Sequence, residues 1–353
     1  MGGETLDVII LSDPDLAADL ADRLVGELPE LLSQRISDEV TWRVGEVLNP
    51  LAGDEQVNVD LMVEVVGKRM PELGWDYGVC LTDLPRRAGR RPVVAELSAD
   101  NGIALVSLPA FGSVRLYPRV REAVVHLIGE LHGSAYPARA HPLGRSEPGD
   151  GSGLLFVVPG ARGRLRLLAG MVRANRPWRL FLGLSKTLAG VFAVAAFALL
   201  QSDVWRIATT LGPLRQTIVA VTAVAALVTW LVVDHELWER PSGAGRRARA
   251  VLYNTATSIT VTLGVLCLYA ALLLPLTAVL LLVLSPPVLA NALGHAPGWA
   301  DYAAISWFAT SASMVGGALG AGLEDDAAVR RAAYGERQRQ RQRLLREDSA
   351  EAA

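Results

Sequence analysis

The chain has 353 residues, of which 51% are hydrophobic and 20% charged, and its mean hydropathy is +0.30. Charged residues make up about a quarter of an ordinary soluble domain, so this composition excludes a disordered chain and argues against a purely soluble enzyme. Residues 1–150 contain 14 Lys/Arg and 24 Asp/Glu, whereas residues 151–353 contain 20 Lys/Arg and 12 Asp/Glu. The net charge of −2 therefore combines −10 in the first part with +8 in the second, where nearly all long apolar runs lie. This division predicts an acidic soluble domain joined to a basic membrane domain.

The first fifteen residues, MGGETLDVIILSDPD, contain neither a basic segment nor an apolar stretch of the length found in secretory signals. We therefore expect the first domain to stay in the cytosol. The two cysteines, Cys80 and Cys267, lie far apart in apolar segments, which gives neither a disulfide framework nor a metal knuckle.

Residues 1–133 have the pattern of a soluble domain of α/β or α+β type with a mixed sheet. Asp7–Leu11 is a continuous apolar run typical of a buried strand, and the leucines at 16, 20, 24 and 28 follow it at helical spacing. Ser12 or Asp13 is expected to cap that helix. The later predicted elements are a strand at 40–46, a helix at 55–70, a strand at 76–81, a hairpin of 93–97 and 103–108 turning at Asn101-Gly102, and a helix at 119–131.

The last of these helices carries the most informative polar residues, Glu122, His126 and His132. In zinc proteases the HExxH motif places two histidine ligands on one helix face beside a glutamate base. An extended form of the motif adds a glycine turn and a third ligand at three-residue steps. When this helix is aligned with that pattern, the three ligand positions are occupied by Glu122, His126 and His132. Ala123 stands at the position of the base, and Gly129 stands at the turn.

Together with Leu81-Thr82-Asp83-Leu84 and the element order up to residue 132, this helix resembles the archaemetzincins, a metzincin-like group of zinc peptidases. The resemblance covers roughly residues 5–133 and implies a metal site on the helix. The sequence departs from the family at the base position, because Ala123 cannot take a proton from water. No cysteine follows His132, and the next methionine is Met171, so no Met-turn is visible. Peptidase activity of the family type is therefore not expected.

Two interpretations of the helix remain open. Glu122, His126 and His132 form a two-histidine, one-carboxylate set that suits zinc or iron. Alternatively, Glu122, His126 and Glu130 recur every four residues opposite an apolar face, which is typical of a solvated helix face. We favour the second interpretation and expect no cofactor, with zinc or iron as the alternative.

Three further segments connect and end the chain. Residues 134–160 are rich in Gly, Pro and Ser and predict a flexible linker. Residues 161–177 mix leucines with arginines and predict an amphipathic helix on the inner membrane surface. Residues 324–353 form a basic cytosolic tail, which we expect to bind anionic lipid and not nucleic acid, because it lacks interleaved aromatic residues.

The membrane domain spans residues 178–323 and contains four apolar runs near the length of about 20 residues that crosses a bilayer. These predicted spans lie at about 180–200, 217–233, 251–273 and 302–323, with a re-entrant or interfacial piece at 274–293 after Pro275. If that piece also crosses, the count becomes five. Four crossings place every arginine-rich loop on one side, so we predict a multi-pass bacterial inner-membrane protein with both termini cytoplasmic.

The segments Gly170–Trp178 and Leu237–Arg240 resemble a group of uncharacterised bacterial membrane proteins, which implies topology but no activity. The leading hypothesis is a non-catalytic inner-membrane protein whose cytosolic domain is a binding or sensing module for an unknown protein partner. A membrane-tethered metal-dependent hydrolase is one alternative. A transporter or channel is another, although its ionisable candidates all lie at span ends, where charge is least costly. These candidates are Asp203, Asp234, His235, Glu236 and Asp301.

Overall fold

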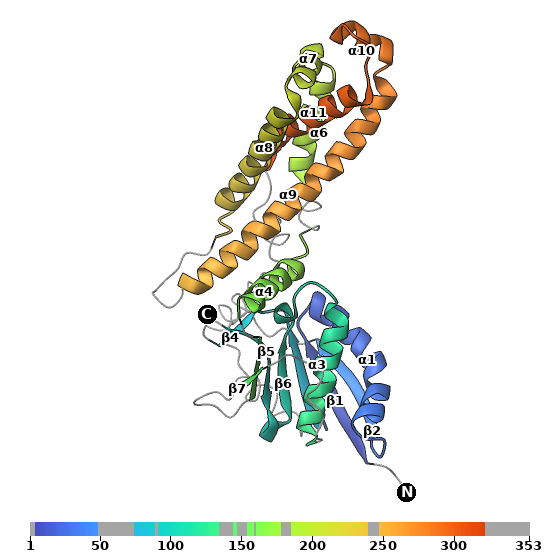
Figure 1. Cartoon of the computed structure of the whole chain (residues 1–353). Helices are drawn as coiled ribbons and strands as arrows, with labels where there is room; N and C mark the ends of the chain where they lie inside the picture. The colour runs from blue at the N-terminus through green and yellow to red at the C-terminus, as the bar shows by residue number, and fades with distance from the viewer. Residues whose placement is uncertain are drawn as a thin grey trace, which may run out of the picture. The chain divides into compact units, whose positions relative to one another are not determined.

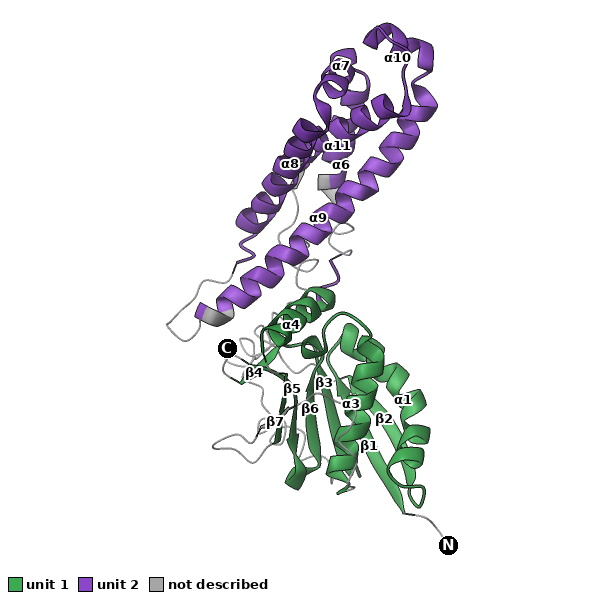
Figure 2. Cartoon of the chain, viewed as in Figure 1, with its two compact units in different colours: residues 1–174, 336–353 green, residues 175–335 purple. Residues whose placement is uncertain are grey.

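The structure is a computed structural model that describes residues 4–48, 74–88, 91–133, 144–146, 154–158, 160–177, 185–238 and 247–321. The described residues divide into two compact units, one ending at Ala174 and one beginning at Asn175 (Figure 2). The helix predicted at 55–70 and the basic tail at 324–353 lie outside the described residues.

The first unit is built on a mixed sheet of eight strands within the described residues, which confirms the predicted sheet type (Figure 1). The strands are β1 Thr5–Ser12, β2 Thr41–Leu48, β3 Tyr77–Thr82, β4 Arg86–Ala88, β5 Arg91–Ser98, β6 Ile103–Ser107, β7 Gly144–Ser146 and β8 Leu154–Val157. Their order is β2-β1-β3-β6-β5-β8-β7, with β4 beside β5. Strands β2, β1, β3 and β6 are mutually parallel, whereas β5 pairs antiparallel with β6, β4 and β8.

Two helices, α1 Leu16–Arg35 and α3 Leu116–Leu131, pack against the parallel strands and against each other (Figure 1). The leucine spacing predicted for α1 is confirmed, because Leu20, Leu24 and Leu28 are buried and Leu16 is half-buried. In α3 the apolar residues Val120, Val124, Leu127 and Ile128 are buried in the same way. These side chains and the inner faces of the strands form the core of the unit.

The predicted hairpin is present, with the 3₁₀ turn η2 Ala99–Asn101 between β5 and β6. Gly102 ends this turn with a φ of +63°, and a Cβ atom there would lie 2.7 Å from the Asp76 carbonyl oxygen. Both the left-handed backbone and the close approach therefore require glycine at this position.

The structure differs from the predicted linker, because two strands lie within residues 134–160. Strand β8 pairs with β5, and its Phe156 and Val157 are buried. The sequence Leu154–Val157 is apolar and suited to a strand, but its glycine- and proline-rich flanks concealed it.

The predicted amphipathic helix is present as α4 Gly160–Ala174. Its buried side packs on the 3₁₀ helix η3 Leu108–Phe111 of the sheet unit, so part of its apolar face serves folding. The contact is close, because a Cβ atom on Gly170 would lie 2.0 Å from the Pro109 carbonyl oxygen.

The second unit is entirely helical in its described residues. Its helices are α6 Ser185–Leu199, α7 Ser202–Thr210, α8 Gly212–Asp234, α9 Arg247–Val283, α10 Pro286–Leu293 and α11 Trp299–Ala321. By length and composition, α8 and residues 250–283 of α9 are able to cross a membrane. A third span results if α6 and α7, which meet at a 90° bend, count as one.

The predicted boundary at Pro275 is wrong, because α9 continues through this proline to Val283 and only then gives way to α10. Proline removes one backbone donor, and membrane helices tolerate this when neighbouring groups compensate. The fourth predicted span coincides with α11, but α11 is not among the described helices that are apolar enough to be counted as spans.

Helix α11 is the packing centre of this unit and contacts α6, α7, α8 and α9. Small residues allow this, since a Cβ on Gly316 would lie 2.4 Å from Val194 of α6. Its buried hydroxyls donate to the carbonyl four residues earlier, as in Ser306 to Tyr302 and Thr310 to Ser306, each 2.8 Å long. Low hydropathy in α11 therefore reflects small polar residues that face other helices.

Candidate functional site

The carboxyl ends of the parallel strands hold a group of buried polar side chains. Asp13 follows β1 and Thr82 and Asp83 come at the end of β3, so adjacent parallel strands bring them to one edge of the sheet. Asp13 and Asp83 are only 4% and 3% exposed. In open α/β sheets, ligands bind at this edge.

Hydrogen bonds hold the residues of this edge in fixed positions. The Thr82 hydroxyl donates to Asp13 Oδ2 over 2.6 Å and accepts the Leu84 backbone N–H over 3.1 Å. The Asp13 backbone N–H donates to the Leu81 carbonyl over 3.0 Å. Burial, and then the charge of Asp13, raise the pKa of the neighbouring Cys80 thiol well above its usual value. Cys80 is therefore a packing residue and not a nucleophile.

Strand β6 closes the same edge through Ser107. Its hydroxyl donates to the Leu84 carbonyl over 2.7 Å and accepts the Arg86 N–H over 3.3 Å. The Arg86 guanidinium is in turn 3.0 Å from Glu96 on β5. The carboxyl edge, defined here as Asp13, Thr82, Asp83 and Ser107, is thus a buried and pre-organised cluster of hydrogen-bonded polar side chains.

The sequence did not predict this grouping. Asp13 was expected to cap α1, but α1 begins at Leu16 after Asp15, whose φ is +71°, without a side-chain capping bond. The available signal was that DVIILSD and GVCLTD are both buried strands ending in Asp, which places the two carboxylates at one edge of a parallel sheet.

Glu122, the first predicted metal ligand, is directed toward α1. Its Oε2 atom lies 2.7 Å from Arg35 Nη1, and its Oε1 atom lies 3.9 Å from Arg121. The same Arg121 also contacts Glu27, 2.9 Å away, and this hydrogen bond lowers the pKa of Glu27. Glu122 therefore takes part in an ion-pair network between α1 and α3.

His126 and His132 have separate surroundings. His126 Nε2 lies 3.9 Å from Glu130, and its ring stands edge-on to Phe156 of β8 with centroids 5.8 Å apart. His132 Nδ1 lies 3.2 Å from the Tyr77 hydroxyl at the start of β3, and its ring stands edge-on to Trp42. Burial, followed by the charge of Asp76, raises the pKa of Tyr77.

The structure does not bring the three predicted ligands together. In the part of the chain that it describes, no three His, Cys, Asp or Glu side chains gather closely enough to hold a metal ion. The reason is local, because Gly129 stays buried within α3 and the helix continues to Leu131. A chain that turned at Gly129 would return His132 toward His126, whereas the unbroken helix directs it to Tyr77. Ala123, at the base position, is buried.

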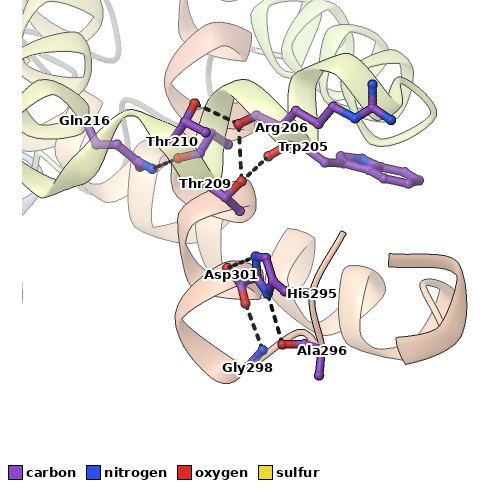
Figure 3. A network of polar contacts seen from close by, with 10 residues as sticks. Trp205, Arg206, Thr209, Thr210, Gln216, His295, Ala296, Gly298 and Asp301 are labelled. Atoms are coloured by element: carbon purple, nitrogen blue, oxygen red, sulfur yellow. Dashed lines mark hydrogen bonds and ion pairs between the residues drawn. The ribbon is translucent and has the colours of Figure 1, made fainter. Parts of the chain in front are cut away.

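In the helical unit, two polar contacts lie at helix ends. The Arg206 side chain donates to the Ala292 carbonyl over 2.8 Å and so ties α7 to α10. Figure 3 shows Asp301 accepting the Gly298 N–H over 2.8 Å at the start of α11, with His295 Nε2 3.9 Å from the same carboxylate. Asp301, predicted as a span-end charge, therefore stabilises a helix start.

A shallow groove of about 420 Å³ runs between α8 and α9. Its lining consists of uncharged residues: Ala220, Val221, Val224, Ala225, Val228, Thr229, Thr262, Leu266 and Tyr269. Such a lining suits lipid or another helix, and it supplies no charged group for an ion or polar solute.

Comparison with protein-family models, with curated proteins and with solved structures found no match to this chain. The similarity to archaemetzincins and to the bacterial membrane proteins therefore remains a prediction from the residues. The candidate site is therefore argued from geometry alone, on the buried polar cluster at the carboxyl edge.

Proposed function

We propose that this chain is an integral inner-membrane protein with four spans and cytosolic termini, whose sheet unit is a non-catalytic binding or sensing module. The observation that carries the membrane part is the distribution of side chains in the helical unit. Large apolar residues such as Ile218, Leu274 and Leu282 are exposed, whereas the hydroxyls of Ser306 and Thr310 are buried. Water would disfavour this arrangement, and lipid tails favour it.

The four-span proposal counts α11 as a span despite its polar composition. Its 23 residues extend about 35 Å, enough for the hydrocarbon core. Its neighbours α6, α8 and α9 cover it, and its hydroxyls are satisfied within the helix, so little polar surface would reach lipid. The arginine-rich loops then all fall on the cytosolic side.

Reporter fusions test this topology in cells. A cytosol-active fluorescent protein fused after residue 353 should be bright, and alkaline phosphatase inserted at Ala296, between α10 and α11, should be active outside the cytosol. A phosphatase that is active after residue 353 would show an odd number of spans. Release of the chain by alkaline carbonate would show that it is not integral to the membrane.

The binding role rests on the carboxyl edge and on helix α3, which has Ala123 at the position of the catalytic base. The edge holds two buried carboxylates at the end of the sheet where open α/β folds bind ligands, so the ligand class that we assign to it is a small molecule with a positive charge, such as an amine. Ala123 is buried where a peptidase of the metzincin type has its base, which supports a role without catalysis.

A ligand panel of primary amines and small carboxylic acids tests the binding role on the full-length protein in nanodiscs. A bound amine present at 100 times its Kd should stabilise the sheet unit by about 2.7 kcal/mol. Asp13→Asn should abolish that gain, whereas Asp100→Asn on the exposed η2 turn should leave it unchanged. Stabilisation by the acids alone, or by neither class, would contradict the proposed ligand chemistry.

A further inference from the structure

The exposed side of α4 combines arginines with a large apolar side chain. The helix contains four arginines and no acidic residue. Leu165 is 68% exposed, although α4 has a well-packed buried face that could have accommodated a leucine. At about 100° per residue, Arg162 and Arg164 lie about 60° and 100° from Leu165, on opposite sides of it. Both arginines are exposed.

The loop beside α4 repeats this combination. Val114 is 65% exposed and Arg115 next to it is exposed. The loop is held to α4 by Arg173, whose Nη1 donates to the Ser113 carbonyl. We name Val114, Arg115, Arg162, Arg164 and Leu165 the α4 surface.

Among the described residues, the arginines at this place contact backbone carbonyls and not carboxylates. Arg119 and Arg166 both donate to the Phe111 carbonyl, over 3.0 Å and 2.8 Å. Burial, and then the nearby charge of Arg119, lower the pKa of Arg166. None of the arginines on α4 forms an ion pair with a carboxylate among the residues that the structure describes.

The helical unit follows α4 directly in the chain, because it begins at Asn175. Asn175 directly follows α4, and its side-chain amide lies 3.3 Å from the Thr260 hydroxyl within the apolar part of α9. A single exposed leucine is ordinary on a soluble surface, but two exposed apolar side chains grouped with three exposed arginines make a combined patch. A bilayer surface accepts both, because the apolar side chain enters the acyl boundary while guanidinium groups meet phosphates.

We propose that the α4 surface binds the bilayer itself, with Leu165 and Val114 inserted and Arg115, Arg162 and Arg164 on the phosphates of anionic lipid headgroups. This proposal rests on the proposed membrane location. Binding would hold the sheet unit against the membrane in an orientation set by lipid charge.

The test uses the full-length chain in nanodiscs with a polarity-sensitive fluorophore on Leu165→Cys. The background carries Cys267→Ser, and the remaining Cys80 is fully buried and does not react. A matched probe on Gln34→Cys, exposed on α1, reports the aqueous reference. Nanodiscs contain phosphatidylcholine alone or with 30% phosphatidylglycerol, and brominated lipids serve as quenchers.

With phosphatidylglycerol, the probe at 165 should shift to the blue and be quenched by brominated lipid, while the probe at 34 should do neither. Arg162→Gln with Arg164→Gln should lower the docked-to-free ratio on the order of 25-fold, and the double lysine variant should restore most of it. A probe at 165 that stays as aqueous as the one at 34 would overturn the proposal. So would a blue shift without lipid quenching, which would indicate a protein contact. Failure of the chain to enter nanodiscs would instead refute the membrane location.

Discussion

The close contact between α4 and η3 leads to a quantitative prediction. Gly170 lies in the second half of α4, and a Cβ there would be 2.0 Å from the Pro109 carbonyl oxygen and 2.7 Å from its carbonyl carbon and Cα. Real Cβ atoms essentially never approach closer than 3.0 Å, so Gly170→Ala forces α4 about 1 Å away from η3. Overpacking against atoms that cannot rotate away costs roughly 1–3 kcal/mol, and backbone atoms place this case near the upper end.

Gly26 offers the matched control, because it lies within α1 and a Cβ there meets no atom within 4 Å. Alanine is the better helix former by about 1 kcal/mol, so Gly26→Ala should stabilise α1. The two substitutions add the same methyl group to a helix and should act in opposite directions.

Amide hydrogen exchange on the full-length protein in nanodiscs measures both effects. Gly170→Ala should lower the protection of α4 amides on the order of 100-fold, while Gly26→Ala should raise that of α1 about fivefold. Unchanged protection of α4 in Gly170→Ala would refute the proposed close packing of α4 on η3.

Three other measurements examine the sheet unit. Thr82→Val removes a hydrogen bond to the buried Asp13 carboxylate and should destabilise β1 and β3 by about 1.5–3 kcal/mol in hydrogen exchange, whereas Thr82→Ser should not. Burial, and then contact with Glu27, raise the pKa of Tyr117 to about 12. A phenol with a raised folded-state pKa binds its proton more tightly when folded, so its stabilisation is intact below pH about 10 and is lost as pH rises to about 12. A phenolate absorbance titration should show this late ionisation disappear in Tyr117→Phe; its persistence would contradict the assignment. Elemental analysis of the purified chain should find no stoichiometric zinc or iron. Stoichiometric metal in the unmodified chain that is lost in the His126→Ala and His132→Ala variants would contradict this expectation and establish a metal site.

Much of the sheet unit could be predicted because its signals are local. The apolar run in β1, the leucine spacing in α1 and the Asn101-Gly102 turn each depend on a few neighbouring residues. The strand β8 was missed because its four apolar residues gain stability from β5, which lies more than fifty residues away in sequence. Pairing between distant segments leaves little trace in local composition.

The candidate site also depends on contacts between distant segments, which the local sequence does not reveal. The spacing of Glu122, His126 and His132 suits a metal only if the chain turns at Gly129, and tertiary packing decides that Gly129 remains helical. Conversely, Asp13 and Thr82 are 69 residues apart, and only the parallel pairing of β1 with β3 makes them neighbours. In the helical unit, composition identified α8 well but could not show that α9 passes Pro275 unbroken.

In the proposed membrane location, the unbroken α9 creates a hydrophobic mismatch. Its apolar part, residues 250–283, extends about 51 Å, whereas the hydrocarbon core is about 30 Å thick. To fit entirely within that core, a straight helix would tilt by about 54°, beyond the range of about 0–40° seen for membrane helices. Leu280 and Leu284 instead pack with Trp205 of α7, Leu289 of α10 and Ile305 of α11. Protein therefore covers only one side of the last turns of α9, because Leu282 and Val283 on the other side remain exposed. In the proposed membrane location, α7 and α10 would take up part of the excess length of α9, and tilt or local thickening of the bilayer would take up the rest.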